Sequence, residues 1–157
     1  MATVSPQRPW SYTLELPHEP HAPAIARVTL RSVLGRHGMA KVAETAELLA
    51  CELVTNAYVH TNGRCSLRLQ GWEDGRLRVS VWDTNPHVPP QFGPEESAPQ
   101  VHDPDSEAGR GLLLLRLCAD NWGGYAYDRH VFGPCGGKTL WFELAPRTAA
   151  ARYGVTV

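Results

Sequence analysis

The sequence predicts a two-layer α/β sandwich, in which helices cover one face of a mixed, mostly antiparallel sheet. Two helical patterns follow each other directly, and four of the five strand-like segments come in neighbouring pairs. Strands adjacent in sequence favour antiparallel pairing, and grouped helices cannot alternate strictly with strands. The expected order is therefore strand, two helices, two strands, a loop, a helix and two strands.

The composition fits one globular domain over 1–157, with a core of about 11–145. The chain has 157 residues, 43% of them hydrophobic and 20% charged, which is enough to bury a substantial core. A net charge of −1 and a pI near 6.6 give no field that would attract nucleic acid or an anionic membrane. We expect no zinc site, because the four cysteines lack CxxC spacing and the histidines are scattered. We also expect a reduced, cytoplasmic protein, because the sequence shows no export signal and no long apolar run.

The first strand and the first helix are short, clear patterns. The segment SYTLELP (11–17) alternates apolar and polar residues before a proline, as a half-buried strand does. A helix is expected over about 23–37, where four large apolar residues recur near helical spacing, and Gly38 is expected to end it in the left-handed conformation. The apolar residues are Ile25, Val28, Val33 and Leu34.

The second helix, expected over about 42–60, combines an apolar stripe with polar interruptions. At about 100° per residue, Asn56 and His60 project into the arc of that stripe and Glu52 lies at its edge. A buried carboxylate or amide costs several kcal/mol unless it is paired. The helix therefore either satisfies these groups internally or borders a polar cavity. The stripe consists of Val42, Ala46, Leu49, Leu53 and Ala57.

The rest of the chain alternates hairpins with a long connection. Strands are expected over 65–72 and 76–83, joined by an Asp74-Gly75 turn, and again over 122–128 and 138–144. Between these pairs, residues 84–108 hold six prolines and five acids but no Lys or Arg, which is typical of a lid or binding loop. A glycine-led helix over 109–119 follows this loop, and 146–157 form a tail with little pattern.

Three further polar signals surround these elements. Asp83 closes a strand, where it can accept a hydrogen bond from an exocyclic amine such as that of adenine. Gly109 and Gly111 flank Arg110 at a helix start, where free N–H groups and a cation favour phosphate oxygens. Thr139 adds a hydroxyl on the last strand. Each signal alone also has a structural reading: a turn-initiating Asp, a tight glycine turn, and a good strand former.

Together, these segments resemble the ATP-binding domain shared by histidine kinases and type II topoisomerases, the GHKL or Bergerat fold. The resemblance spans about residues 11–145. ELVTNAYVH looks like the N box of this family, VWDTN like its first glycine-box strand, and GRGL like its second glycine box. The short length and the ending GGKTLWFEL look most like the small anti-sigma-factor serine-protein kinases and ATP-binding regulators of actinobacteria.

The resemblance implies ATP and Mg²⁺ as ligands and assigns roles to the matching residues. Asn56 would bind Mg²⁺, Glu52 would act as general base, and Asp83 would read the adenine amino group with support from Thr139. The phosphate cradle would be Gly109, Arg110, Gly111 and Leu112. One departure is visible: the run Asp83-Thr84-Asn85-Pro86-His87 lacks the glycines that usually follow the adenine-reading Asp.

Three functional classes follow from the resemblance. In the first, the protein is a serine kinase that phosphorylates an anti-sigma-factor antagonist and holds a sigma factor. In the second, it is a non-catalytic module that sequesters a sigma factor or other regulator under the control of ATP. In the third, it is a scaffold without nucleotide binding. Glu52 and Asn56 together favour the first class, whereas the altered glycine box and the acidic loop favour the second. A homodimer is compatible with each class.

Overall fold

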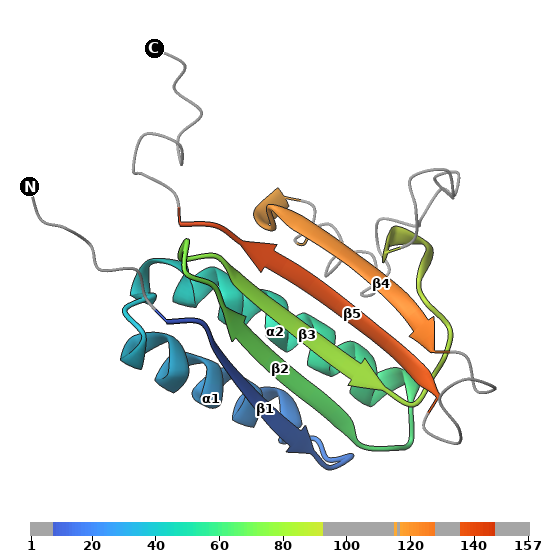
Figure 1. Cartoon of the computed structure of the whole chain (residues 1–157). Helices are drawn as coiled ribbons and strands as arrows, with labels where there is room; N and C mark the ends of the chain where they lie inside the picture. Colours follow the sequence, from blue (N-terminus) through green and yellow to red (C-terminus); the bar gives the residue numbers. More distant parts are fainter. Residues whose placement is uncertain (1–7, 93–114, 116, 128–135, 147–157) are drawn as a thin grey trace, which may run out of the picture.

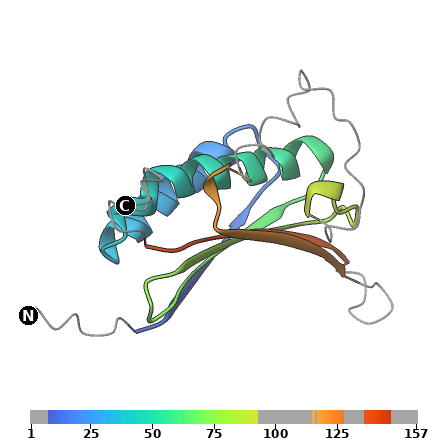
Figure 2. The same cartoon turned by 90° about the horizontal axis from the view of Figure 1, so that it is seen from above.

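The computed structural model describes residues 8–92, 115, 117–127 and 136–146. Within these residues, a five-stranded sheet in the order β1-β2-β3-β5-β4 carries two helices on one face (Figures 1 and 2). The predicted two-layer α/β fold is confirmed, and all four strand pairings are antiparallel. The elements are β1 (Trp10–Leu16), α1 (Ala22–Arg36), α2 (Ala40–His60), β2 (Cys65–Gly71), β3 (Leu77–Asp83), the short 3-10 helix η1 (Pro90–Phe92), β4 (Asn121–Tyr127) and β5 (Gly137–Leu144).

Helix α1 buries only part of the apolar set that indicated it. Its buried residues follow an i, i+4 spacing: Ala22, Ala26, Leu30 and Leu34. Of the four apolar residues that predicted the helix, Leu34 is buried, whereas Ile25 and Val28 are 43% and 69% exposed. Small alanine side chains allow close approach to α2, and this packing decides the buried face. Gly38 ends the helix with φ at 68°, the predicted left-handed conformation.

Helix α2 lies across β2, β3 and β5, with α1 on its β1 side (Figure 1). Of the predicted stripe, four residues are buried and Val42 is half-buried at the margin. The buried residues of the helix are Ala46, Glu47, Leu49, Ala50, Leu53, Val54 and Ala57. Glu47 is buried because Arg31 of α1 donates to its Oε1 at 2.8 Å.

The sheet separates the two faces by alternation along each strand. Side chains of β3 that point to the helices are buried, and those between them are half-buried. The other face carries arginines stacked on tryptophans: Arg64 lies 5.1 Å from the ring centre of Trp82, and Arg78 lies 4.1 Å from that of Trp141. The β2–β3 hairpin turns at Gly75, whose φ of 83° confirms the predicted glycine turn.

Little of the predicted glycine-led helix falls within the described residues. Leu115 is buried in the same core as the strands and helices. The cradle residues Gly109, Arg110, Gly111 and Leu112 lie outside the described part of the chain, as does most of the predicted loop over 84–108.

Candidate functional site

Glu52 and Asn56 lie one turn apart on the flank of α2 that faces away from α1. Asn56 follows Glu47 by nine residues, and at about 100° per residue this places it on roughly the opposite side of the helix from the contact with Arg31. Both side chains are half-buried, which is compatible with a helix flank that borders a polar cavity; His60, expected within the arc of the apolar stripe, is exposed. This flank faces the β5 side of the sheet.

No hydrogen bond or ion pair involves the side chain of Glu52 or Asn56 in the part of the chain that the structure describes. Polar side chains at the margin of a core are usually satisfied by protein or water. Within the described residues, Glu52 and Asn56 thus offer an unbonded carboxylate and an unbonded amide oxygen one helical turn apart. Such oxygens suit a hard cation or a polar ligand.

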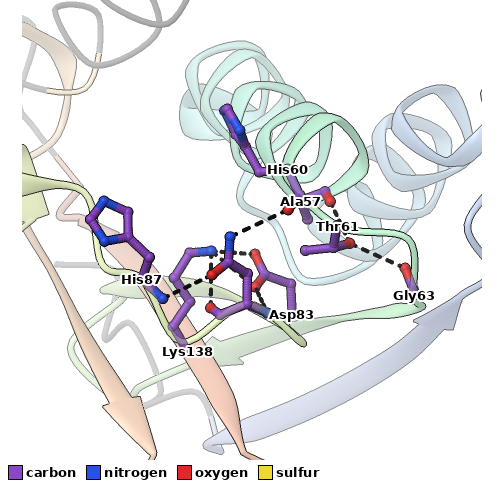
Figure 3. Close-up of polar contacts among 8 residues, drawn as sticks. Ala57, His60, Thr61, Gly63, Asp83, His87 and Lys138 are labelled. Atoms are coloured by element: carbon purple, nitrogen blue, oxygen red, sulfur yellow. Dashed lines mark hydrogen bonds and ion pairs between the residues drawn. The ribbon is translucent and has the colours of Figure 1, made fainter.

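Asp83, at the end of β3, forms a buried ion pair with Lys138 of β5. The two residues are direct partners in the β3–β5 register and are both 1% exposed. The Lys138 Nζ donates to Oδ1 of Asp83 at 2.9 Å and to Oδ2 at 2.8 Å. It also donates to the Asn85 carbonyl at 3.3 Å. The pair lies on the helix face of the sheet, below the C-terminal end of α2 (Figure 3).

The segment after Asp83 is fixed by two consecutive side-chain-to-backbone turns. The Asn85 N–H donates to Oδ1 of Asp83 at 2.9 Å, and the His87 N–H donates to Oδ1 of Asn85 at 3.0 Å. The Asn85 side-chain amide then donates to the carbonyl of His60 at 3.3 Å. These contacts connect the end of β3 to the end of α2 without any glycine in the turn.

The end of α2 is itself held by Thr61. The Thr61 hydroxyl donates to the Ala57 carbonyl at 2.7 Å and lies 3.4 Å from the Gly63 carbonyl (Figure 3). Carbonyls in the last turn of a helix have no partner within the helix, so this bond satisfies one of them. The helix end that faces the Asp83–Lys138 pair therefore has a defined position.

The first residue of β5 must be glycine for the ion pair to form. Gly137 has φ at 119°, and a Cβ at this position would lie 2.0 Å from the backbone oxygen of Asp83. Only glycine adopts this conformation readily and allows the two backbones to approach so closely. The close approach sets Lys138 opposite Asp83.

Thr139 lies on the other face of the sheet, away from Asp83. It pairs with Trp82, and its hydroxyl is 3.1 Å from the Tyr127 hydroxyl. Asp83 thus lies on the face of the sheet that α2, with Glu52 and Asn56, covers, whereas Thr139 lies on the opposite face. The β5 residue next to the Asp83 carboxylate is Lys138.

Cys65 is the other titratable group beside Asp83. Burial, and to a smaller extent the negative charges of Asp83 and Glu15, raises the pKa of its thiol to about 11. The thiol is therefore protonated and unreactive at neutral pH. It acts as a small apolar side chain beneath the site.

The family assignment rests on comparison with known proteins. Residues 16–141 match the family model for the histidine kinase-like ATPase domain, which is most of the chain. The chain belongs to the histidine kinase-like ATPase family. The match includes both helices, the Asp83 loop and the start of β5, so the geometry above is that of a family whose members bind nucleotide.

A solved structure agrees with the fold of this histidine kinase-like domain. A chain of the SiaB–SiaC complex from Pseudomonas aeruginosa superposes with a TM-score of 0.62 at 14% identity, over 85% of this chain and 88% of that one. None of the curated proteins compared with this sequence matches it significantly.

Two further properties of this histidine kinase-like domain concern metal ions and membranes. Among the described residues, no group of three or more His, Cys, Asp or Glu side chains is arranged to bind a metal ion. A metal bound here would depend on few protein ligands, as Mg²⁺ does when phosphate and water supply the remainder. No helix in the described ranges is long and apolar enough to cross a membrane.

Lys138 is the site residue that the sequence reasoning missed. The strand run KTLWFEL places Lys138 on the same face as Leu140, Phe142 and Leu144, which are the core residues of β5. A lysine in phase with three apolar residues was a readable signal of a buried cation. The family resemblance instead implied a role for the neighbouring Thr139, whose hydroxyl lies on the other face of the strand.

Proposed function

We propose that this chain binds Mg-ATP between the flank of α2 that carries Glu52 and Asn56 and the end of the β3–β5 pair. The observation that carries the proposal is that Glu52 and Asn56, free of partners within the described chain, lie one turn apart on the side of α2 away from α1. Asp83 is buried on the same side of the sheet with acceptor capacity at Oδ2. One side of the fold thus carries three polar groups: a carboxylate suited to a general base, an amide suited to a metal ion, and a carboxylate suited to a nucleobase.

Each of these residues has a role that its chemistry suits. The side-chain oxygen of Asn56 is a hard ligand, and Mg²⁺ usually takes only one or two ligands from protein beside phosphate and water. Asp83 accepts from the amino group of adenine. Gly109, Arg110, Gly111 and Leu112 form the phosphate cradle, in which backbone N–H groups and one guanidinium neutralise the phosphate charge.

We propose that the bound nucleotide serves serine phosphorylation of a regulatory protein. Bound ATP supplies the phosphoryl group that is transferred. Glu52 takes the proton from the attacking serine hydroxyl, as a positioned general base does. The substrate we propose is an anti-sigma-factor antagonist, and the second partner is a sigma factor. The similar Pseudomonas aeruginosa fold occurs in a complex of two proteins, which supports a role in partner binding.

One feature favours a second candidate, an ATP-dependent binding module without catalysis. The turn after Asp83 is held by side-chain hydrogen bonds from Asn85 rather than opened by glycines. A rigid turn is enough for a protein whose shape is set by bound ATP. Phosphoryl transfer needs more, because the reacting groups must be repositioned at each turnover. In this case ATP controls how tightly the sigma factor or other regulator is held.

Incubation with labelled ATP and candidate antagonists from the same genome tests the kinase proposal. We expect label on a serine of one antagonist with wild-type protein, and a loss of at least about 100-fold in rate with Glu52→Gln, because this variant removes the base but keeps the shape. Mg-ATP affinity should stay unchanged in this variant. The matched control is Thr55→Ala, an exposed position on the same helix, which should behave as wild type.

The outcomes separate the candidates. Transfer that survives Glu52→Gln would remove the base assignment. Mg-ATP binding without transfer to any antagonist, but with nucleotide-dependent capture of a sigma factor, would leave the binding module as the function.

A binding measurement tests the metal assignment independently. Asn56→Ala should remove the part of ATP affinity that depends on Mg²⁺, because the metal loses its protein ligand. Titration calorimetry with and without EDTA gives this difference for wild type and variant. A variant that retains the full Mg²⁺ dependence would show that Asn56 does not hold the metal.

A further inference from the structure

The buried charge of Lys138 is not explained by the stability of the fold. Among the ion pairs of the described residues, Lys138–Asp83 is the one in which both side chains are almost fully buried, at 1% and 2% exposure. Removing two charges from water costs several kcal/mol each, and replacing such a pair by apolar residues is often neutral or stabilising. The same face of β5 continues with Leu140 and Phe142, so an apolar residue suits the position.

The hydrogen bonds of Lys138 leave one replaceable contact. An ammonium group has three donors. Two go to the Asp83 carboxylate at 2.9 and 2.8 Å, and the third goes to the Asn85 carbonyl at 3.3 Å. The third contact is the longest and therefore the weakest of the three. An acceptor on a ligand can take its place without breaking the ion pair.

The Asp83 carboxylate has the complementary capacity. Oδ1 accepts from Lys138 and from the Asn85 N–H, whereas Oδ2 accepts, among the described residues, from Lys138 alone. A carboxylate oxygen accepts two hydrogen bonds. The ion pair therefore presents a free acceptor next to a donor. The adenine edge presents the reverse pattern, an amino group beside the unprotonated ring nitrogen N1.

The surroundings keep this donor and acceptor in place. The Asn85 backbone and side chain hold the Asp83 loop against the end of α2, and Gly137 brings the start of β5 against the Asp83 backbone. A polar pair fixed from two sides is preorganised, so binding does not require its reorganisation. This rigidity suits a group that reads a ligand.

We propose that Lys138 is a second base-reading residue, which donates to N1 of adenine while Asp83 accepts from the adenine amino group. The proposal rests on the proposed nucleotide binding and adds a specificity-determining residue to it. With Lys138, the site tests two positions of the base edge and rejects a base in which either one is altered.

The test compares ATP with 1-deaza-ATP, which keeps the amino group but has a carbon in place of N1. Affinities are measured by titration calorimetry for wild type, Lys138→Met and the control Lys41→Met, which changes the only other lysine of the chain. We expect wild type to bind 1-deaza-ATP at least about tenfold more weakly than ATP, the usual effect of losing a hydrogen bond to a charged group. Lys41→Met should behave as wild type.

Lys138→Met should bind ATP more weakly than wild type does and should bind ATP and 1-deaza-ATP equally well. Equal affinity of wild type for the two nucleotides would overturn the role of Lys138 while leaving the proposed function intact. Failure of wild type to bind either nucleotide would instead overturn the proposed function. If Lys138→Met does not fold, the comparison of the two nucleotides on wild type still decides the question.

Discussion

At the scale of single residues, the polar groups near α2 divide into two sets with opposite surroundings. Asp83 and Lys138 are buried and bonded to each other, whereas Glu52 and Asn56 are half-buried and unbonded within the described residues. Buried groups that are bonded to each other are rigid, and this suits recognition of a flat base. Half-exposed groups exchange water for a ligand at a low cost in free energy. This suits the binding of a metal ion and the transfer of a proton.

Cys65 gives a prediction about pH at this scale. Its pKa is about 11 in the folded protein against an ordinary value of 9.0, chiefly because it is buried. Between these two values the unfolded chain loses the proton while the folded chain keeps it, so folding stability falls as pH rises from about 9 to about 11. Below about pH 9 both states hold the proton and this contribution does not vary.

Urea unfolding of wild type and Cys65→Ala at a series of pH values measures this effect. The variant should lose less stability between pH 9 and 11 than wild type, because it lacks the titrating thiol. The comparison uses the slope of the free energy of unfolding against pH. A loss of packing in the variant that is the same at every pH does not change this slope. Parallel slopes for the two proteins would contradict the assigned pKa.

Residue identity was easier to read from the sequence than the face on which a residue lies. Asp83 was placed correctly at the end of its strand, and Glu52 and Asn56 correctly on the same helix. The β3–β5 register then decides that Lys138, and not Thr139, lies opposite Asp83. This register depends on where a strand 55 positions away enters the sheet, which local patterns do not reveal.

At the scale of elements, the strand and helix positions followed from local pattern, and the buried faces did so only in part. Each described strand and helix begins and ends within about two residues of its predicted range, because turn signals and alternation are local. The buried stripe of α1 was different, since packing against α2 selects its alanines over the larger Ile25 and Val28. The glycine-led helix over 109–119 is described at too few positions to compare.

The junction of β3 and β5 gives a prediction at this scale, with an internal control. Gly137→Ala should lower the free energy of unfolding by at least about 2 kcal/mol, because the alanine Cβ meets the fixed backbone oxygen of Asp83 at a positive φ. Gly35→Ala makes the same change near the end of α1, where no atom lies within 4 Å of the new Cβ. This control should raise the stability by about 0.5–1 kcal/mol, the usual gain of alanine over glycine in a helix.

Midpoints of urea unfolding at pH 7 compare the two variants directly. Opposite signs for the two alanines would agree with the described junction. A Gly137→Ala protein as stable as wild type would show that β5 does not approach β3 as described.

At the scale of the whole molecule, nucleotide binding should stabilise the fold. Mg-ATP at a hundredfold excess over its Kd should add about 2.7 kcal/mol to the free energy of unfolding, because only the folded state has the site. For a chain of this length that corresponds to a rise in Tm of about 5–10 °C. Thermal melting with Mg-ATP, with ATP plus EDTA and without nucleotide measures the rise and its dependence on metal. No rise at millimolar Mg-ATP would favour a scaffold that has lost its ligand.

The strand order has a consequence for synthesis of the protein on the ribosome. Residues 10–83 already contain β1, both helices and the β2–β3 hairpin, so the β1–β2 and β2–β3 pairings can form within this segment. Lys138 enters only when β5, the last of the described strands to be synthesised, inserts between β3 and β4. Between the synthesis of Asp83 and that of Lys138, a nascent chain therefore exposes an unpaired Asp83 and the open edge of β3. We expect chaperones to bind this open edge of β3. Nucleotide should bind only after β5 has paired with β3.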